Sequence, residues 1–374
     1  MKFWRTIIGT ALVSLALIAT AAQARTIGHE AQAVIDTFLA PPTIKPEAGF
    51  TAQLLIPPGE LYDPLFMLPH GDAVWMNDDG KATDGHGSRL LAISPDGKIS
   101  VLMGPAKLLL VTGFDRAPQG FGSYGGQLFS LSQATTAMKG ALSNHVVQRI
   151  DLAAHSTSVF CTLPTAGEVG NGIPGFGADA RFGPAGSGFA NIFYSATILN
   201  DMIYETLADG TCKPFADLSK LGGPAGIAFT PDGSAMLVTV TPGDITKPGR
   251  EAKGMIVRIT PDGKVDPKPI VTGLKSPLGL EVAPAGFGKY AGQIFVNDVG
   301  EIQAPAPQTQ ALKPDGKVYR VTPEGDLKLV AAGFINPSGL HFIGNHLWIT
   351  DINGDFVAGF RELPDGFLTQ IDVQ

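Results

Sequence analysis

The sequence predicts an all-β protein, a six-bladed β-propeller with four-stranded blades. Three observations support this fold class: a strand core that recurs along the chain, a second short strand that precedes several of its copies, and Pro-Asp-Gly turns that follow it. The composition, with 44% hydrophobic and 16% charged residues, is typical of a globular protein. The 47 glycines and 29 prolines indicate many turns.

The recurring strand core has an aromatic or aliphatic centre, often followed by polar residues. It reads "AVWMNDD", "QLFSLSQ", "NIFYSAT", "AMLVTVT", "QIFVNDV" and "HLWITDI". The six copies align on Val74, Leu128, Ile192, Leu237, Ile294 and Leu347. Four-stranded units of this length, repeated around a ring, make a propeller, and six copies predict six blades.

Each copy is flanked by two further elements. "GPAGIAF", "SPLGLEV" and "NPSGLHF" precede it and are expected to be inner strands. "AISPDGK", "RITPDGK" and "RVTPEGD" join alternating strands through turns in which Pro sets φ, Asp bonds its own backbone and Gly takes positive φ. We therefore expect each blade to run from an inner strand outward. Either the strand near "FTAQLLI" or the C-terminal "FRELPDGFLTQIDV" is expected to complete the last blade.

One Gly-rich string occurs twice, as "APQGFGSYGG" and "APAGFGKYAG". A phosphate-binding glycine loop opens a helix after a strand, whereas a strand follows each of these copies. They are therefore expected to be tight connections whose Phe121, Tyr124, Phe287 and Tyr290 plug the blade edge. This frame places the connections on the rim opposite Asp298.

The N-terminus has the pattern of an export signal. Lys2 and Arg5 precede an apolar run, and a small-residue "AQA" follows it. The predicted organisation is a signal peptide over residues 1–24, an extension with a short helix over 25–45 and the propeller over 46–374. Periplasmic or secreted localisation follows, and no later stretch is apolar and long enough to span a membrane.

The net charge limits the kinds of partner that we expect, and the cysteine content allows one disulfide. Cleavage would remove Lys2 and Arg5 and take the net charge from −7 to −9, which argues against nucleic acid as a partner. A small-molecule substrate or an unknown protein partner is expected instead. Cys161 and Cys212 could form a disulfide in an exported chain or remain separate buried thiols.

Oxygen-bearing side chains are predicted to converge on the rim that receives the starts of the inner strands and the ends of the second strands. We expect Asp63, Asn171, Asp244 and Asp298 to be candidate ligands of a divalent metal, because hard cations such as Ca²⁺ prefer oxygen donors. His341, on the inner strand "NPSGLHF", is the candidate for proton transfer, together with Asp298. Single acidic turn residues more often cap loops.

The chain resembles the senescence-marker and gluconolactonase superfamily of six-bladed propellers, which includes strictosidine-synthase-like proteins. "NGI" at Asn171, followed by "IFYSAT", is similar to the segment whose Asn binds the catalytic divalent metal in that family. The resemblance implies Asn171 as a metal ligand. The chain departs from the family at Ala225, because the family has an acidic metal ligand at this position, within a "PDG" sequence. The glutamate of the family's "EGP" sequence has only Asp63, followed by Pro64, as its counterpart in this chain.

A second resemblance is to soluble sugar dehydrogenases that carry pyrroloquinoline quinone on a six-bladed propeller. It rests on "KPEAGFTAQLLI" and "APAGFGKYAGQIFV". It implies a histidine at the rim, His70 or His86, with Arg89 and Arg116 for the quinone carboxylates.

Three function classes follow. The first is an exported hydrolase of a lactone or similar small ester, in which a rim-bound Ca²⁺ or Zn²⁺ polarises the carbonyl. The second is a non-enzymatic binding or scaffold propeller, and the third is a quinone-dependent dehydrogenase. The sequence leaves the substrate and the oligomeric state open.

Overall fold

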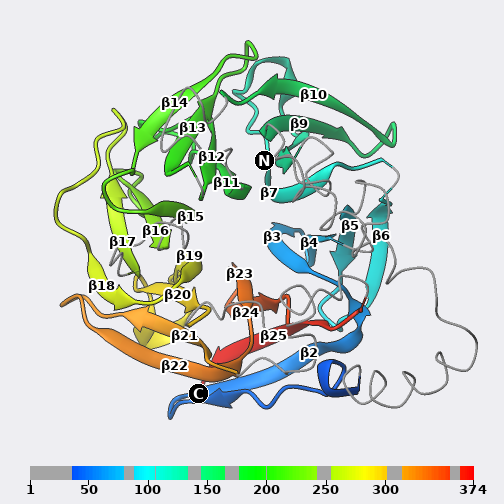
Figure 1. Ribbon diagram of the computed structural model, residues 1–374, viewed down its shortest axis with the longest axis vertical. Helices are drawn as coiled ribbons and strands as arrows, with labels where there is room; N and C mark the ends of the chain where they lie inside the picture. The colour runs from blue at the N-terminus through cyan, green and yellow to red at the C-terminus, as the bar shows by residue number, and fades with distance from the viewer. Residues whose placement is uncertain are drawn as a thin grey trace, which may run out of the picture.

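The computed structural model shows the chain folded into a ring of six antiparallel sheets (Figure 1). We call the axis of this ring, which the six inner strands surround, the central channel. The structure describes residues 36–79, 88–105, 107–133, 145–164, 177–198, 200–241, 254–300, 314–353 and 363–374. Within these ranges almost all regular structure is β-strand, so the predicted six-bladed propeller is confirmed.

Each blade runs outward from the strand next to the channel, and blades are numbered here in the order of their inner strands. Blade 1 comprises β3 (Pro64–His70), β4 (Ala73–Asp79), β5 (Ser88–Ile93) and β6 (Ile99–Met103). Blade 2 comprises β7 (Leu110–Arg116), β8 (Leu128–Gln133), β9 (His145–Asp151) and β10 (Ser156–Thr162). Blade 3 comprises β11 (Gly177–Phe182), β12 (Phe193–Thr197), β13 (Met202–Thr206) and β14 (Cys212–Asp217). Blade 4 comprises β15 (Gly223–Phe229), β16 (Met236–Thr241), β17 (Gly254–Ile259) and β18 (Val271–Leu274). Blade 5 comprises β19 (Pro277–Val282), β20 (Ile294–Asp298), β21 (Gly316–Val321) and β22 (Leu327–Phe334). Blade 6 includes β23 (Pro337–Ile343), β24 (His346–Asp351) and β25 (Gly366–Val373).

The N-terminal strand closes the ring. β2 (Phe50–Leu61) pairs antiparallel with β25 and is the outermost strand of blade 6, beside the C-terminus (Figure 1). The short β1 (Lys45–Pro46) adds a fifth strand to blade 5. The strand near "FTAQLLI" therefore completes the last blade, and "GFLTQIDV" supplies its third strand. Because the first and last segments share one sheet, closing the ring requires both ends of the chain.

Glycines allow the inner strands to approach one another around the channel. A Cβ on Gly113 of β7 would lie 2.0 Å from the backbone nitrogen of Ala180 in β11. A Cβ on Gly339 of β23 would lie 2.0 Å from the carbonyl oxygen of Leu65 in β3. These positions tolerate no side chain, because the neighbouring backbone already occupies the space.

The twice-used Gly-rich string connects the first and second strands of a blade, as predicted. In each copy a short 3-10 turn, η1 (Gly122–Tyr124) or η3 (Gly288–Tyr290), leads into the next strand. Phe121 and Phe287 are buried, and their rings pack edge-to-face on the aromatic residues of the adjoining blade core. Gly122 and Gly288 adopt positive φ, at 53° and 59°, which explains the glycine.

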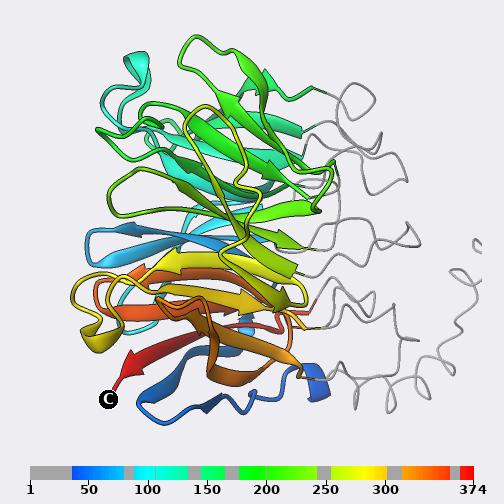
Figure 2. The ribbon, with the colours of Figure 1, turned by 90° about the vertical axis from the view of Figure 1, so that its left-hand side faces the viewer.

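The two rims are separated as predicted. Pro277 pairs with Asp298 at one end of the β19–β20 ladder, and Val282 pairs with Ile294 at the other, next to the connection that contains Phe287. Asp298 and Phe287 therefore lie on opposite faces of the ring. Figure 2 shows the ring from the side, with its two faces to the left and right. We call these faces the Asp298 rim and the Phe287 rim.

A disulfide joins two neighbouring blades. Cys161 of β10 bonds Cys212 of β14, and these are the outermost strands of blades 2 and 3. The sequence left this pairing open.

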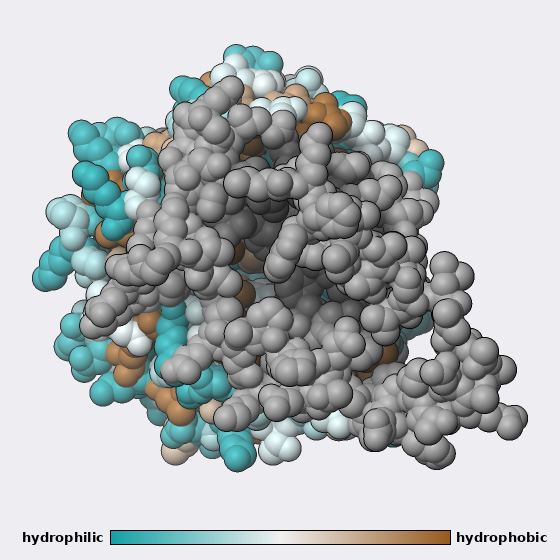
Figure 3. Space-filling model, in the orientation of Figure 1, coloured by the Kyte–Doolittle hydropathy of each residue, from teal (hydrophilic) through white to brown (hydrophobic). Residues whose placement is uncertain are grey.

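Figure 3 shows hydrophilic side chains along the outer edge of the ring. Among the described residues, no helix has the length and apolarity needed to cross a membrane.

Candidate active site in the central channel

One residue from each inner strand occupies an equivalent position along the channel. Each of these residues pairs with the second or third residue of the second strand of its blade. In four of the six inner strands, the residue two places earlier is a glycine that lies against the next inner strand. The equivalent pairs are Leu68 with Trp75, Asp115 with Phe129, Arg181 with Tyr194, Ala228 with Leu237, Glu281 with Phe295, and His341 with Trp348. Four of the six members of this ring carry an ionisable side chain.

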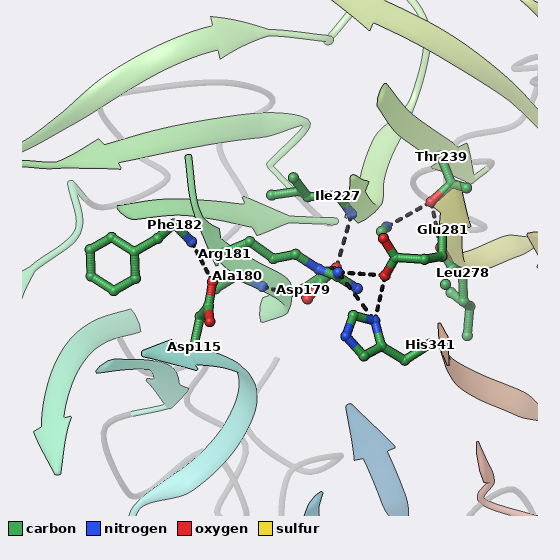
Figure 4. A network of polar contacts seen from close by, with 12 residues as sticks. Asp115, Asp179, Ala180, Arg181, Phe182, Ile227, Thr239, Leu278, Glu281 and His341 are labelled. Atoms are coloured by element: carbon green, nitrogen blue, oxygen red, sulfur yellow. Dashed lines mark hydrogen bonds and ion pairs between the residues drawn. The ribbon is translucent and has the colours of Figure 1, made fainter. Parts of the chain in front are cut away.

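Arg181 is the centre of the ionisable cluster. Its Nη1 donates to Glu281 Oε2 at 2.8 Å, and its Nε donates to Asp179 Oδ2 at 3.0 Å. Glu281 belongs to blade 5, two blades away, and the intervening ring member is the small Ala228. Figure 4 shows the guanidinium extending from β11 towards Glu281 and His341. The arginine therefore links inner strands that are not neighbours.

His341 is held by a carboxylate. Its Nδ1 contacts Glu281 Oε2, the same oxygen that accepts from Arg181. A carboxylate at Nδ1 favours the tautomer that carries its proton there and leaves Nε2 with a lone pair. Figure 4 shows the second ring nitrogen turned away from Glu281. The side chains of His341 and Glu281 are 14% and 19% exposed, so water can reach both.

Two aspartates connect the cluster to the backbone of adjacent blades. Asp179 stands where four of the other inner strands have glycine, and its Oδ2 accepts from the backbone N–H of Ile227 in blade 4 at 3.0 Å. Asp115 Oδ2 accepts from the N–H of Phe182 in blade 3 at 2.8 Å. These bonds fix the relative position of the inner strands that carry Arg181 and Asp115.

The environment moves the pKa values of the cluster in opposite directions. Burial opposes ionisation of Glu281, but the charges of Arg181 and His341 outweigh it and lower the pKa of Glu281 to about 2. Burial would lower the pKa of Arg181, yet the carboxylates of Asp179 and Glu281 raise it above its ordinary value. Burial raises the pKa of Asp115 to about 6, although two backbone N–H bonds favour its charged form. One carboxyl is thus fixed as an anion, while another can take a proton near neutral pH.

The predicted site residues do not all meet. His341 lies in the channel cluster. Asp63 and Asp298 lie on the Asp298 rim, at the start of β3 and the end of β20. Asn171 and Asp244 lie outside the described residues, so their assignment as metal ligands stays a prediction.

Asp298 caps a turn between blades. Its carboxylate accepts N–H bonds from Lys275, Ser276 and Gly300 at 2.9, 2.7 and 3.1 Å. Asp351 does the same at the end of β24 for Ile335, Asn336 and Asn353. The aspartate that ends these second strands thus orders the entry to the inner strand of its own blade.

Two asparagines at the ends of second strands, Asn297 before Asp298 and Asn77 before Asp78, connect adjacent blades. Asn297 accepts from the N–H of Gly279 and donates to the carbonyl of Ser338 in blade 6. Asn77 accepts from Phe66 and donates to Val111 in blade 2. Both asparagines are fully buried. The asparagines of these two "ND" pairs therefore have a structural role, because they link the inner strands of adjacent blades.

By themselves, the described donors form no site for a divalent metal. No group of three or more His, Cys, Asp or Glu side chains within the described ranges is arranged to hold an ion. Both oxygens of Asp298 already accept backbone N–H bonds. Ala225 in β15 offers no oxygen on its side chain. No catalytic step is therefore derived through a metal.

The candidates for a quinone site are also dispersed. Arg116 contacts His70 Nδ1, and its guanidinium lies 4.7 Å from the Trp75 ring centroid near the Phe287 rim. Arg89 lies at the other rim, where it forms an ion pair with the buried Asp78. His86 is outside the described residues. Because the two arginines lie on opposite rims, they cannot both bind the carboxylates of one quinone.

The fold and the channel define a six-bladed propeller with a charged cluster at its axis. No protein-family model and no curated protein sequence matches the chain. Among solved structures it is similar to a gluconolactonase from Xanthomonas campestris, at a TM-score of 0.56 and 15% identity, over 90% of this chain and 95% of that one. A glucose dehydrogenase gives 0.56 and 14% over 87% and 100%. Regucalcin, a calcium-binding protein from Agrobacterium tumefaciens, gives 0.51 and 16% over 87% and 94%.

These similarities confirm, at the level of the fold, the resemblance to gluconolactonase-type propellers. Because the sequence identities are only 14 to 16%, these similarities show the fold of this chain and not its function.

Sequence reasoning found His341 but missed Glu281, Arg181 and Asp115. A usable signal existed for Glu281, because "PLGLEV" and "NPSGLHF" align Glu281 with His341 directly. Arg181 lies in "GADARF", which lacks the Pro-x-Gly-Leu pattern, so its register appears only once β11 is paired with β12.

Proposed function

We propose that the protein is an exported enzyme that hydrolyses a lactone or similar small ester in its central channel. The observation that carries this proposal is the contact between Glu281 and Nδ1 of His341, beside the guanidinium of Arg181. A histidine held in this way by a carboxylate is suited to act as a general base. Export is supported by the N-terminal sequence pattern, and the Cys161–Cys212 bond is compatible with it.

The proposed reaction begins with a water molecule near Nε2 of His341. The imidazole takes a proton from this water as its oxygen attacks the carbonyl carbon, and Glu281 stabilises the imidazolium that forms. Negative charge develops on the carbonyl oxygen. Arg181 has five N–H donors, and its bonds to Asp179 and Glu281 leave others to face that oxygen.

The test compares wild-type protein with His341→Gln on δ-valerolactone and p-nitrophenyl acetate. We expect kcat to fall by about 10²- to 10⁴-fold, the range for loss of a positioned base. His346→Gln is the matched control, because His346 also contacts a carboxylate, Asp372, but lies exposed on β24. Full activity in the His341 variant, or loss of activity in the His346 variant, would contradict the proposal.

Participation of Ca²⁺ or Zn²⁺ is a separate proposal with its own measurement. Metal analysis of purified protein, repeated on Asn171→Ala, tests the ligand set Asp63, Asn171, Asp244 and Asp298. Stoichiometric metal that is lost in the variant would support a metal-assisted hydrolase. A folded protein that hydrolyses neither probe would favour the binding propeller.

A further inference from the structure

Asp115 shares the channel with His341 at the same level of the ring. It comes from β7 of blade 2, whereas His341 comes from β23 of blade 6, and Leu68 of blade 1 is the ring member between them. Figure 4 shows Asp115 and His341 on opposite sides, with the side chain of Arg181 crossing above the space between them. Asp115 is partly exposed, so a substrate in the channel can reach it.

The two carboxylates of the ring differ in their partners. Glu281 accepts from both Arg181 and His341. Asp115 accepts only neutral backbone donors, the N–H of Phe182 at 2.8 Å and that of Arg116 at 2.6 Å. No cation among the described residues forms an ion pair with it, because Arg181 is directed to Asp179 and Glu281. Its protonated form is therefore accessible, in keeping with a pKa raised by burial to about 6.

Charged groups around Asp115 come from five inner strands, its own included. They are Arg116 on its own strand, Asp179 and Arg181 on β11, Glu281 on β19, and His341 and His70 on β23 and β3. Arg181 and His341 favour the charged form of Asp115, but neither cancels the effect of burial. Two carboxyl groups with opposed environments in one site are the usual arrangement for an acid and a base with separate roles.

We infer that Asp115 is the general acid of this site and gives its proton to the leaving oxygen of the substrate. The inference rests on the proposed function. In the first step His341 takes a proton from water and the water oxygen bonds to the carbonyl carbon. In the second, the bond from that carbon to the alkoxy oxygen breaks, and the proton of the Asp115 carboxyl passes to this oxygen. The imidazolium of His341 then returns its proton through solvent to Asp115, so protons and charge balance.

Leaving-group chemistry gives the decisive experiment. The p-nitrophenolate group leaves without being protonated, whereas the alkoxide released when δ-valerolactone opens requires a proton. We expect Asp115→Asn to lose at least about 100-fold more kcat/KM on δ-valerolactone than on p-nitrophenyl acetate, since a positioned acid contributes about 10²- to 10⁴-fold. The fall in wild-type lactonase activity above about pH 6 should disappear in the variant.

Asp351→Asn is the matched control. Asp351 is also a buried carboxyl that accepts backbone N–H bonds and has its pKa raised to about 6, but it lies at the end of β24 outside the channel cluster. Its variant should leave the ratio of the two activities unchanged. Equal losses on both substrates in Asp115→Asn would overturn the role of Asp115 and leave the hydrolase proposal standing.

A measurement without turnover separates the remaining outcomes. The carbon-13 carboxyl resonance that is absent from Asp115→Asn should titrate near pH 6 in the wild-type protein. A titration near pH 4 would overturn the inference even if both probes are hydrolysed. If wild-type protein hydrolyses neither probe, the proposed function fails and the inference fails with it.

Discussion

Replacing Glu281 by Gln should destabilise the protein by an amount that depends on pH. The environment lowers the pKa of Glu281 from 4.5 to about 2, and each pH unit corresponds to ~1.4 kcal/mol, so the ionised carboxylate contributes about 3 kcal/mol to the free energy of unfolding. The side chain is 19% exposed, so solvent screening takes little from this figure. Because the folded pKa is the lower one, the contribution is complete above about pH 4.5 and is lost as the pH falls towards 2.

Urea unfolding at a series of pH values measures this contribution. At pH 7 the Glu281→Gln variant should be about 3 kcal/mol less stable than wild type, and by pH 3 about 2 kcal/mol of that difference should have gone. Asp326→Asn is the control, because Asp326 pairs with Lys328, both side chains are more than half exposed, and a surface pair contributes less than about 1 kcal/mol. A Glu281→Gln difference that stays constant between pH 7 and pH 3 would refute the reasoning.

Three further predictions concern stability. Gly113→Ala should lower the free energy of unfolding, measured in urea, by more than about 3 kcal/mol, because its Cβ would overlap the next inner strand. The control Gly104→Ala should be neutral, because a Cβ there would meet nothing within 4 Å. Equal effects of the two substitutions would contradict the close approach of the inner strands. Replacing Cys161 and Cys212 by Ser should cost about 4 kcal/mol for a bridge that spans 51 residues, and an unchanged urea midpoint would refute it. Burial lowers the pKa of His145 to about 4, so stability falls as the pH drops below 6.5; between pH 7 and pH 5 the wild type should lose about 2 kcal/mol more than His145→Gln, and parallel pH profiles would count against this.

The blade pattern was predictable from sequence because it rests on local rules. Pro-Asp-Gly turns, alternating strands and the buried Phe121 and Phe287 of the Gly-rich connections all depend on nearby residues and recur in several blades. The separation of Asp298 from Phe287 followed directly, since successive connections of an antiparallel sheet alternate between its two ends.

The candidate site was only partly predictable. His341 could be placed on an inner strand, but its partner Glu281 comes from another blade and Arg181 from a third. Asp298, by contrast, was predicted to be a metal ligand, and the structure shows it capping a turn. From the sequence alone, an aspartate after a strand can be a metal ligand or a cap, and only the three backbone N–H groups that bond to Asp298 identify it as a cap.

The sequence by itself determined the fold class, the number of blades and the order of strands within a blade, because these follow from a strand core repeated six times and from turn chemistry that recurs in several blades. The tertiary structure decided how the ring closes, through β2 beside β25, and which side chains meet at the axis. That meeting depends on strand register, since a shift of one residue in β11 would turn Arg181 away from Glu281 and His341. Register between blades is a property of packing and backbone contact across the channel, which no single repeat contains.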